Sequence, residues 1–161
     1  MSQQRHVRTG YSDLSLESLS VAENLLVTSV RLWKQMQICR KSCQEDWRGG
    51  LTSVGLVGIA DAVVEPLMLI VHGDGRIVDI GGLDCDRVSE TECNFLHCIA
   101  LLQHQHVAET ENFLQAILRG PAVRTAMSLA RRFANRLRLA SLELPLRSGE
   151  RTDPSRQGLV H

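Results

Sequence analysis

Aromatic residues are scarce in this chain, since only 4% of its 161 residues are Phe, Trp or Tyr. Leu, Val, Ile and Ala must therefore fill the interior, and a chain of this length can bury such a core without disulfides or metal ions. Lysine is scarcer still, because Lys34 and Lys41 are the only lysines among 18 basic residues. The arginine bias is compatible with a GC-rich bacterial genome.

Long uncharged apolar runs are also absent. The most apolar stretch, 54–71, contains Asp61, Glu65 and Pro66, whereas a membrane span needs about 20 apolar residues without central charges. The five cysteines are an odd number without a CxxC pair, and no secretory signal precedes them. These features predict a soluble cytoplasmic protein with reduced thiols and no membrane contact.

Charge of one sign is scarce in two long parts of the chain, although the net charge is zero. Residues 61–111 contain ten acidic residues against Arg76 and Arg87, and residues 112–161 contain nine arginines against three acidic residues. Such segregation predicts that the segments find partners of opposite charge, within one chain, in a dimer or on another molecule.

The apolar spacing predicts a mostly α-helical, single-domain bundle of about five helices. Ser89 and Glu92 form a capping-box pattern, and Pro121 suits the first turn of a helix. Pro66 predicts a kink in the second helix. The expected helices cover residues 13–43, 52–72, 90–107, 109–119 and 121–142.

Outside the helices, the sequence predicts a disordered arm at 1–12 and a disordered tail at 143–161, which flank a helical domain at 13–142. A short extended segment is expected near 76–80. The alternative is a β-hairpin over 68–79, around the Gly73-Asp74-Gly75 turn.

The first predicted helix has a heptad-like seam, which favours a homodimer formed through helix 13–43. Cys39 and Cys43 belong to this seam and are expected to pack there as small hydrophobic residues. The complete seam consists of Ala22, Leu25, Ser29, Leu32, Met36, Cys39 and Cys43.

The third predicted helix carries the densest cysteine and histidine chemistry. A projection at 100° per residue places Cys93, His97 and His104 on a polar side. Cys93 and His97 are four residues apart and can reach one zinc or iron ion, with Cys85 as a third ligand. A metal or redox sensor is therefore one hypothesis. The alternative is that these residues only face solvent and that the protein has no cofactor.

The last predicted helix carries a row of arginines opposite its apolar stripe. Arg124, Arg131 and Arg138 recur every seven residues, with Arg132 beside them. Nothing in the sequence supports an enzymatic mechanism. We therefore expect a non-enzymatic regulatory or adaptor protein that docks on a protein partner through these arginines. The alternative is a DNA-binding transcriptional regulator, since the Gly120-Pro121 turn gives the outline of a helix-turn-helix, although the pI near 7.0 is low for that class.

Overall fold

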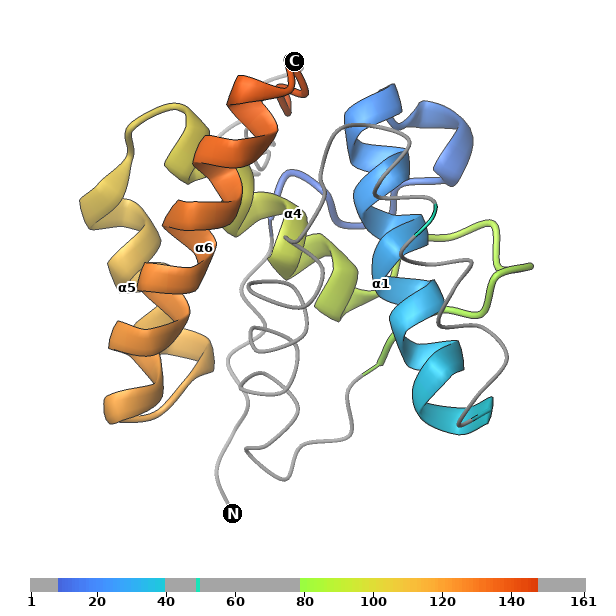
Figure 1. The fold of residues 1–161 in the computed structure, drawn as a ribbon, viewed down its shortest axis with the longest axis horizontal. Helices are drawn as coiled ribbons and strands as arrows, with labels where there is room; N and C mark the ends of the chain where they lie inside the picture. The colour runs from blue at the N-terminus through green and yellow to red at the C-terminus, as the bar shows by residue number, and fades with distance from the viewer. Residues whose placement is uncertain (1–8, 40–48, 50–78, 148–161) are drawn as a thin grey trace, which may run out of the picture.

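The computed structural model describes residues 9–39, 49 and 79–147 (Figure 1). Within them the fold is a helical domain without strands, apart from an isolated bridge between Ser15 and Arg87. The predicted mostly helical bundle is confirmed. Its elements are a 3-10 turn, η1 (Leu16–Ser18), and four helices, α1 (Val21–Cys39), α4 (Glu90–Gln103), α5 (Val107–Ile117) and α6 (Pro121–Leu139).

Two of the sequence predictions fall wholly or mostly on residues that the structure does not describe. The predicted helix at 52–72 lies outside the described residues. So does the predicted extended or hairpin segment, except for its last two residues, 79 and 80, which form no strand.

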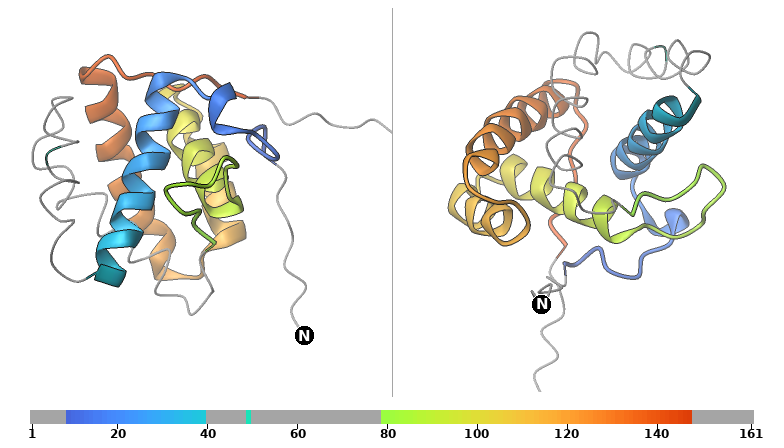
Figure 2. Two further views of the ribbon diagram at one scale, coloured as in Figure 1. Left: turned by 90° about the vertical axis from the view of Figure 1, so that its right-hand side faces the viewer. Right: turned by 90° about the horizontal axis from the view of Figure 1, so that it is seen from below.

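Helix α4 is the centre of the described fold and contacts α1, α5 and α6 (Figures 1 and 2). Leu96, Ile99 and Ala100 have no exposed surface, and ten of the 14 residues of α4 are buried. A helix with neighbours on so many sides cannot keep the polar side that its spacing predicts. Because of this burial, Cys93 of α4 does not face solvent.

Helix α6 packs against α4 through a stripe of mainly small residues. Ala126, Ala130 and Ala134 lie one turn apart and are buried, so the two helices can approach closely. The ring of Phe133 stacks on Phe95 with 6.0 Å between ring centroids. The apolar stripe that the sequence predicts for this helix is confirmed.

Both α1 and α4 begin at a capping box, in which a Ser side chain and a Glu side chain cap each other's backbone. At α4, Ser89 Oγ accepts a hydrogen bond from the Glu92 backbone N–H, and Glu92 accepts one from the Ser89 N–H, as predicted. At α1, Ser20 and Glu23 make the same pair of bonds.

The predicted start of the first helix near residue 13 is wrong. Asp13 has φ of 65°, a left-handed conformation that an α-helix excludes, and residues 9–20 form turns and η1 before α1 begins at Val21. The Ser20 capping box sets the true start of the helix.

The buried residues of α1 include part of the predicted seam. Ala22 and Ser29 of the seam are buried, whereas Leu25 and Leu32 are only partly buried. Leu26, Val30 and Trp33, beside the seam, are buried as well. The apolar residues of both groups belong to or pack against the core of the same chain. The side chains at seam positions 36, 39 and 43 lie outside the description. A homodimer through helix 13–43 stays a prediction.

The described fold continues beyond the predicted domain limits of 13 and 142. Tyr11 has no exposed surface and Leu144 is 1% exposed, so both belong to the core. Gln103 secures the C-terminal segment, since its Nε2 donates to the Leu142 carbonyl (2.8 Å) and its Oε1 accepts from the Leu144 N–H (2.7 Å). Residues 1–8 and 148–161 lie outside the described residues.

We expect Gln103→Ala to lower the free energy of unfolding by about 1–3 kcal/mol, because it leaves the buried Leu144 N–H without its acceptor. Urea unfolding followed by circular dichroism measures the change. Gln115→Ala, on the exposed face of α5, is the control and should change little. An unaltered unfolding midpoint for Gln103→Ala would show that this contact does not hold the segment.

Candidate functional site

The outer face of α6 is the most strongly charged surface of the described fold. The helix contains five arginines and no acidic residue, and all five arginines are exposed. No acidic side chain of the described residues lies within ion-pair distance of them. They are Arg124, Arg131, Arg132, Arg136 and Arg138.

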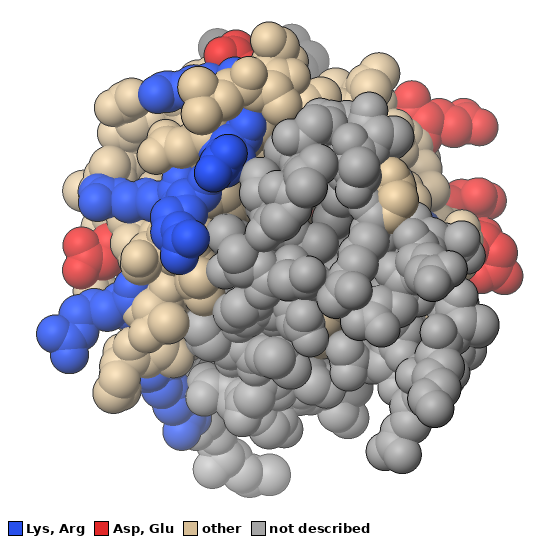
Figure 3. Space-filling model, in the orientation of Figure 1, with Lys and Arg blue, Asp and Glu red and all other residues tan. Residues whose placement is uncertain are grey.

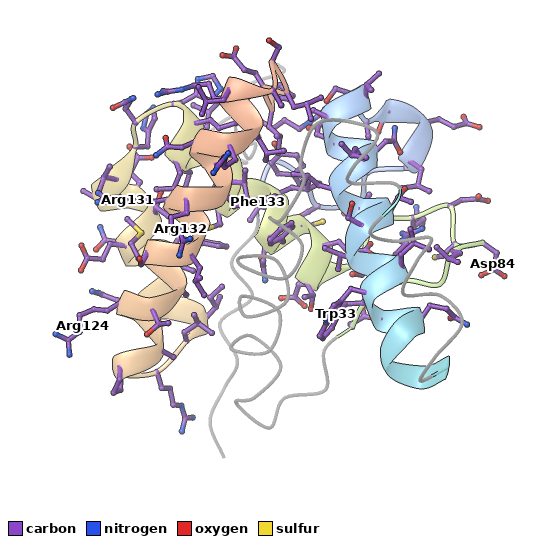
Figure 4. The ribbon with its side chains drawn as sticks, viewed as in Figure 1. Trp33, Asp84, Arg124, Arg131, Arg132 and Phe133 are labelled. Atoms are coloured by element: carbon purple, nitrogen blue, oxygen red, sulfur yellow. The ribbon has the colours of Figure 1, made fainter. Side chains whose placement is uncertain are left out.

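The arginines form two rows along the helix. At 100° per residue, Arg124, Arg131 and Arg138 lie within about 40° of one another and span about 21 Å of helix axis. Arg132 and Arg136 make a second row, roughly 100° or more around the axis from the first. Figure 4 shows Arg124, Arg131 and Arg132 along α6, on the opposite side of the molecule from Asp84.

A narrow polar strip separates the two arginine rows. Ser128 and Asn135 lie between them in the helical projection, as does Leu139 at the C-terminal end, and all three are exposed. The seven-residue spacing of the arginines alone does not reveal this strip. Projecting the outer face of the helix, and not only its arginines, would have found it.

The exposed acidic residues of the described fold lie on other elements. They include Asp79, Asp84 and Asp86 in the segment before α4, and Glu109 and Glu111 on α5, which packs against α6. In Figure 3 basic side chains gather on the left, on the side of α6, and acidic side chains lie mainly along the right edge. Among the described residues on this face, basic side chains therefore predominate on the α6 side and acidic side chains on the opposite side.

Two other arginines are paired with buried carboxylates, which separates them from those of α6. Arg31 is 3% exposed and contacts Glu92, and Arg147 donates to both carboxylate oxygens of Glu23 (2.8 and 2.9 Å). Burial opposes ionisation of Glu23, but hydrogen bonds from Arg147 and Ser20 outweigh it and lower the pKa of this carboxyl. Arg31 and Arg147 serve the fold, whereas the α6 arginines make no such contact with any other residue that the structure describes.

Comparison with known proteins gives one result. No protein-family model, curated protein or solved structure matches this chain.

None of the helices in the described ranges has the length and apolar character that crossing a membrane requires.

Cys93 and His97 are not the solvent-facing residues that the helical projection predicted, whereas His104 is exposed as predicted. Cys93 is 4% exposed, and its Sγ donates to the Tyr11 carbonyl at 3.0 Å. The ring of His97 lies edge-on to Tyr11 and Phe113, with centroid distances of 6.3 and 5.0 Å. The projection failed because the segment around Tyr11 covers this side of α4.

The structure does not assemble the predicted metal ligands into a site. No group of three or more His, Cys, Asp or Glu side chains among the described residues is placed to hold a metal ion. Burial raises the pKa of Cys93 to about 12, which opposes the thiolate that a metal needs, and the exposed Cys85 Sγ donates to the Arg87 carbonyl. Zinc or iron bound by Cys85, Cys93 and His97 stays an untested prediction.

His97 predicts a pH-dependent loss of stability. Burial lowers its pKa below the ordinary 6.5, and Glu109 offsets part of that shift. As the pH falls, the unfolded chain therefore binds a proton at His97 before the folded chain does. The stability of the fold is fully present above pH 6.5 and falls as the pH drops through the lower folded pKa of His97.

We expect the free energy of unfolding to fall more between about pH 7.5 and 5.5 in the wild type than in His97→Gln. Urea titrations at both pH values measure this difference. The window lies above the titration of the Glu23 carboxyl, whose pKa is lowered from 4.5. Equal losses in the two proteins would show that His97 is not the group responsible.

Proposed function

We propose that this protein is a non-enzymatic docking protein, of the regulatory or adaptor kind, which binds an anionic macromolecule through the outer face of α6. The observation that carries the proposal is an exposed, acid-free helix with five arginines that lack ion-pair partners among the described residues. Arg124, Arg131, Arg132 and Arg138 are the principal contacts.

The chemistry of this face supports binding over catalysis. Its exposed side chains include arginines, Ser128 and Asn135, but no Asp, Glu, His or Cys that could act as a general base or a metal ligand. Arginine keeps its charge at all physiological pH values and forms planar, two-pronged hydrogen bonds with carboxylates and phosphates. Such a face suits recognition of an anion.

Two classes of partner fit this charge. An acidic surface of another protein is one, and the exposed Leu139 (80%) at the end of α6 favours it because protein interfaces combine apolar and charged contacts. DNA is the second, and the polar strip between the arginine rows favours it. We further propose a cytoplasmic location, which the three free cysteines of the described residues support.

Affinity capture tests the proposal directly. Wild type and Arg124→Glu/Arg131→Glu/Arg138→Glu are used as bait in lysate of the source cell, with and without nuclease, and bound molecules are identified by mass spectrometry and sequencing. We expect the wild type to retain a partner that the triple variant loses, because three contacts become repulsive.

Arg87→Glu is the matched control, since it introduces the same type of charge reversal at an exposed position before α4, away from α6. It should capture what the wild type captures. Circular dichroism must show equal helix content in all three baits. A folded triple variant that captures the same partners as the wild type would refute docking through α6.

A further inference from the structure

We infer that the anionic partner of α6 is duplex DNA, an inference that rests on the proposed docking function. The first argument is what the outer face of α6 lacks. The buried centre of a protein–protein interface is apolar and combines arginine with aromatic residues and Met, whereas nucleic-acid interfaces are more polar and far more basic. Of the large hydrophobic residues in α6, only Leu139, at the last position, is strongly exposed.

The second argument is the pair of arginine rows. A duplex presents two phosphate strands on either side of its major groove, which is about 12 Å wide and accepts one α-helix. The rows of α6 diverge around the helix axis, one through Arg124 and Arg131 and the other through Arg132 and Arg136. A helix seated in the groove would direct one row to each phosphate strand.

The third argument is the strip between the rows. Ser128 and Asn135 are exposed there, short and uncharged, and they would face the floor of the groove. Asn forms paired hydrogen bonds with adenine, and Ser can donate to or accept from several bases. The two residues lie about 10 Å apart along the helix axis, a distance that covers about three base pairs.

The fourth argument is the orientation of the whole molecule. Asp84 lies on the opposite side of the molecule from Arg124, Arg131 and Arg132 (Figure 4). Phosphate charge repels the acidic side of the described fold and attracts the basic side. This charge distribution orients the protein so that α6 faces an approaching duplex. This accounts for nucleic-acid binding by a chain whose pI is near 7.0.

Fluorescence anisotropy with a labelled duplex of mixed sequence, about 24 base pairs long, tests the inference on the full chain. Five phosphate contacts predict a slope of about −4.5 for log affinity against log salt, hence a loss of about 500-fold between 50 and 200 mM salt. Arg124→Gln/Arg131→Gln/Arg138→Gln leaves two contacts, which predicts a slope of about −1.8 and a loss of about 12-fold. Arg87→Gln, the control, should keep the wild-type slope.

A second variant separates base reading from phosphate binding. Asn135→Ala should flatten the preference among duplexes of different sequence, recovered by selection from a random library, while the salt slope stays at the wild-type value. Unchanged preference in Asn135→Ala would remove the strip from the recognition surface and overturn the groove geometry.

Poly-glutamate of similar length serves as an anion that resembles an acidic protein. Wild-type protein that binds poly-glutamate through the three arginines but not the duplex would overturn the inference and leave the docking function intact. Duplex binding with equal salt slopes in the wild type and the Gln triple variant would also overturn it. Lysate capture that is insensitive to the Glu triple variant, in contrast, refutes the docking function itself.

Discussion

Replacing Glu92 by alanine should lower the free energy of unfolding by about 3–5 kcal/mol, as expected when one partner of a buried ion pair is removed. Glu92 is 1% exposed and accepts hydrogen bonds from Arg31 Nε (2.8 Å) and Nη2 (3.0 Å). The same carboxylate accepts from the Gly81 and Ser89 backbone N–H groups. One side chain therefore joins α1, the segment before α4 and the first turn of α4.

The expected loss is large because Arg31 cannot return to water in the folded state. Its side chain is 2% exposed, and its remaining hydrogen bonds go to the backbone carbonyls of Cys85 (2.5 Å) and Arg87 (2.7 Å). Without Glu92, the guanidinium charge stays buried and loses the carboxylate with which it is paired. Loss of the capping box adds to this cost.

Chemical unfolding of Glu92→Ala, followed by circular dichroism, measures the effect. Glu111→Ala, at an exposed position of α5, is the control and should shift the free energy by less than about 0.5 kcal/mol. The double variant Arg31→Met/Glu92→Leu removes both charges and should recover much of the loss. A single variant as stable as the wild type would refute the structural role of the pair.

Phe133→Ala should also cost about 3–5 kcal/mol, the range expected for truncating a large buried aromatic side chain. Phe133 has no exposed surface and stacks on Phe95 at the contact between α6 and α4. Its truncation leaves a cavity at the contact between α6, which carries the arginines, and α4. We expect weaker docking as well, although every arginine is retained.

The free energy of unfolding of Phe133→Ala is best measured beside that of Ser128→Ala, a truncation on the outer face of the same helix. Ser128 is exposed, so its replacement should change stability by no more than about 0.5 kcal/mol. Equal stabilities of the two variants would mean that α6 does not depend on this contact with α4.

Local signals allowed the sequence to predict several elements of the fold. The Ser89–Glu92 pattern marks the start of α4, and Pro121 marks the start of α6. The stripe through Ala126 and Phe133 identifies the buried face of α6, and the exposed arginines follow from it. Each of these signals depends on residues within about two helical turns of one another.

Long-range contacts explain what the sequence did not predict. Arg31 and Glu92 are 61 residues apart, and Arg147 and Glu23 are 124 residues apart, so no local pattern pairs them. The burial of Cys93 depends on Tyr11, 82 residues earlier. A helical projection treats each helix alone and cannot foresee which of its sides another segment will cover.

Mapping the bound surface by NMR tests the central claim, that α6 is the docking face, most directly. Amide spectra of the labelled full chain are recorded during titration with the duplex and, separately, with poly-glutamate. We predict that shifts concentrate at the outer face of α6, around Arg124, Ser128, Arg131 and Asn135, and spare the acidic segment at 79–86. Binding that shifts residues elsewhere and leaves these four unchanged would contradict the account.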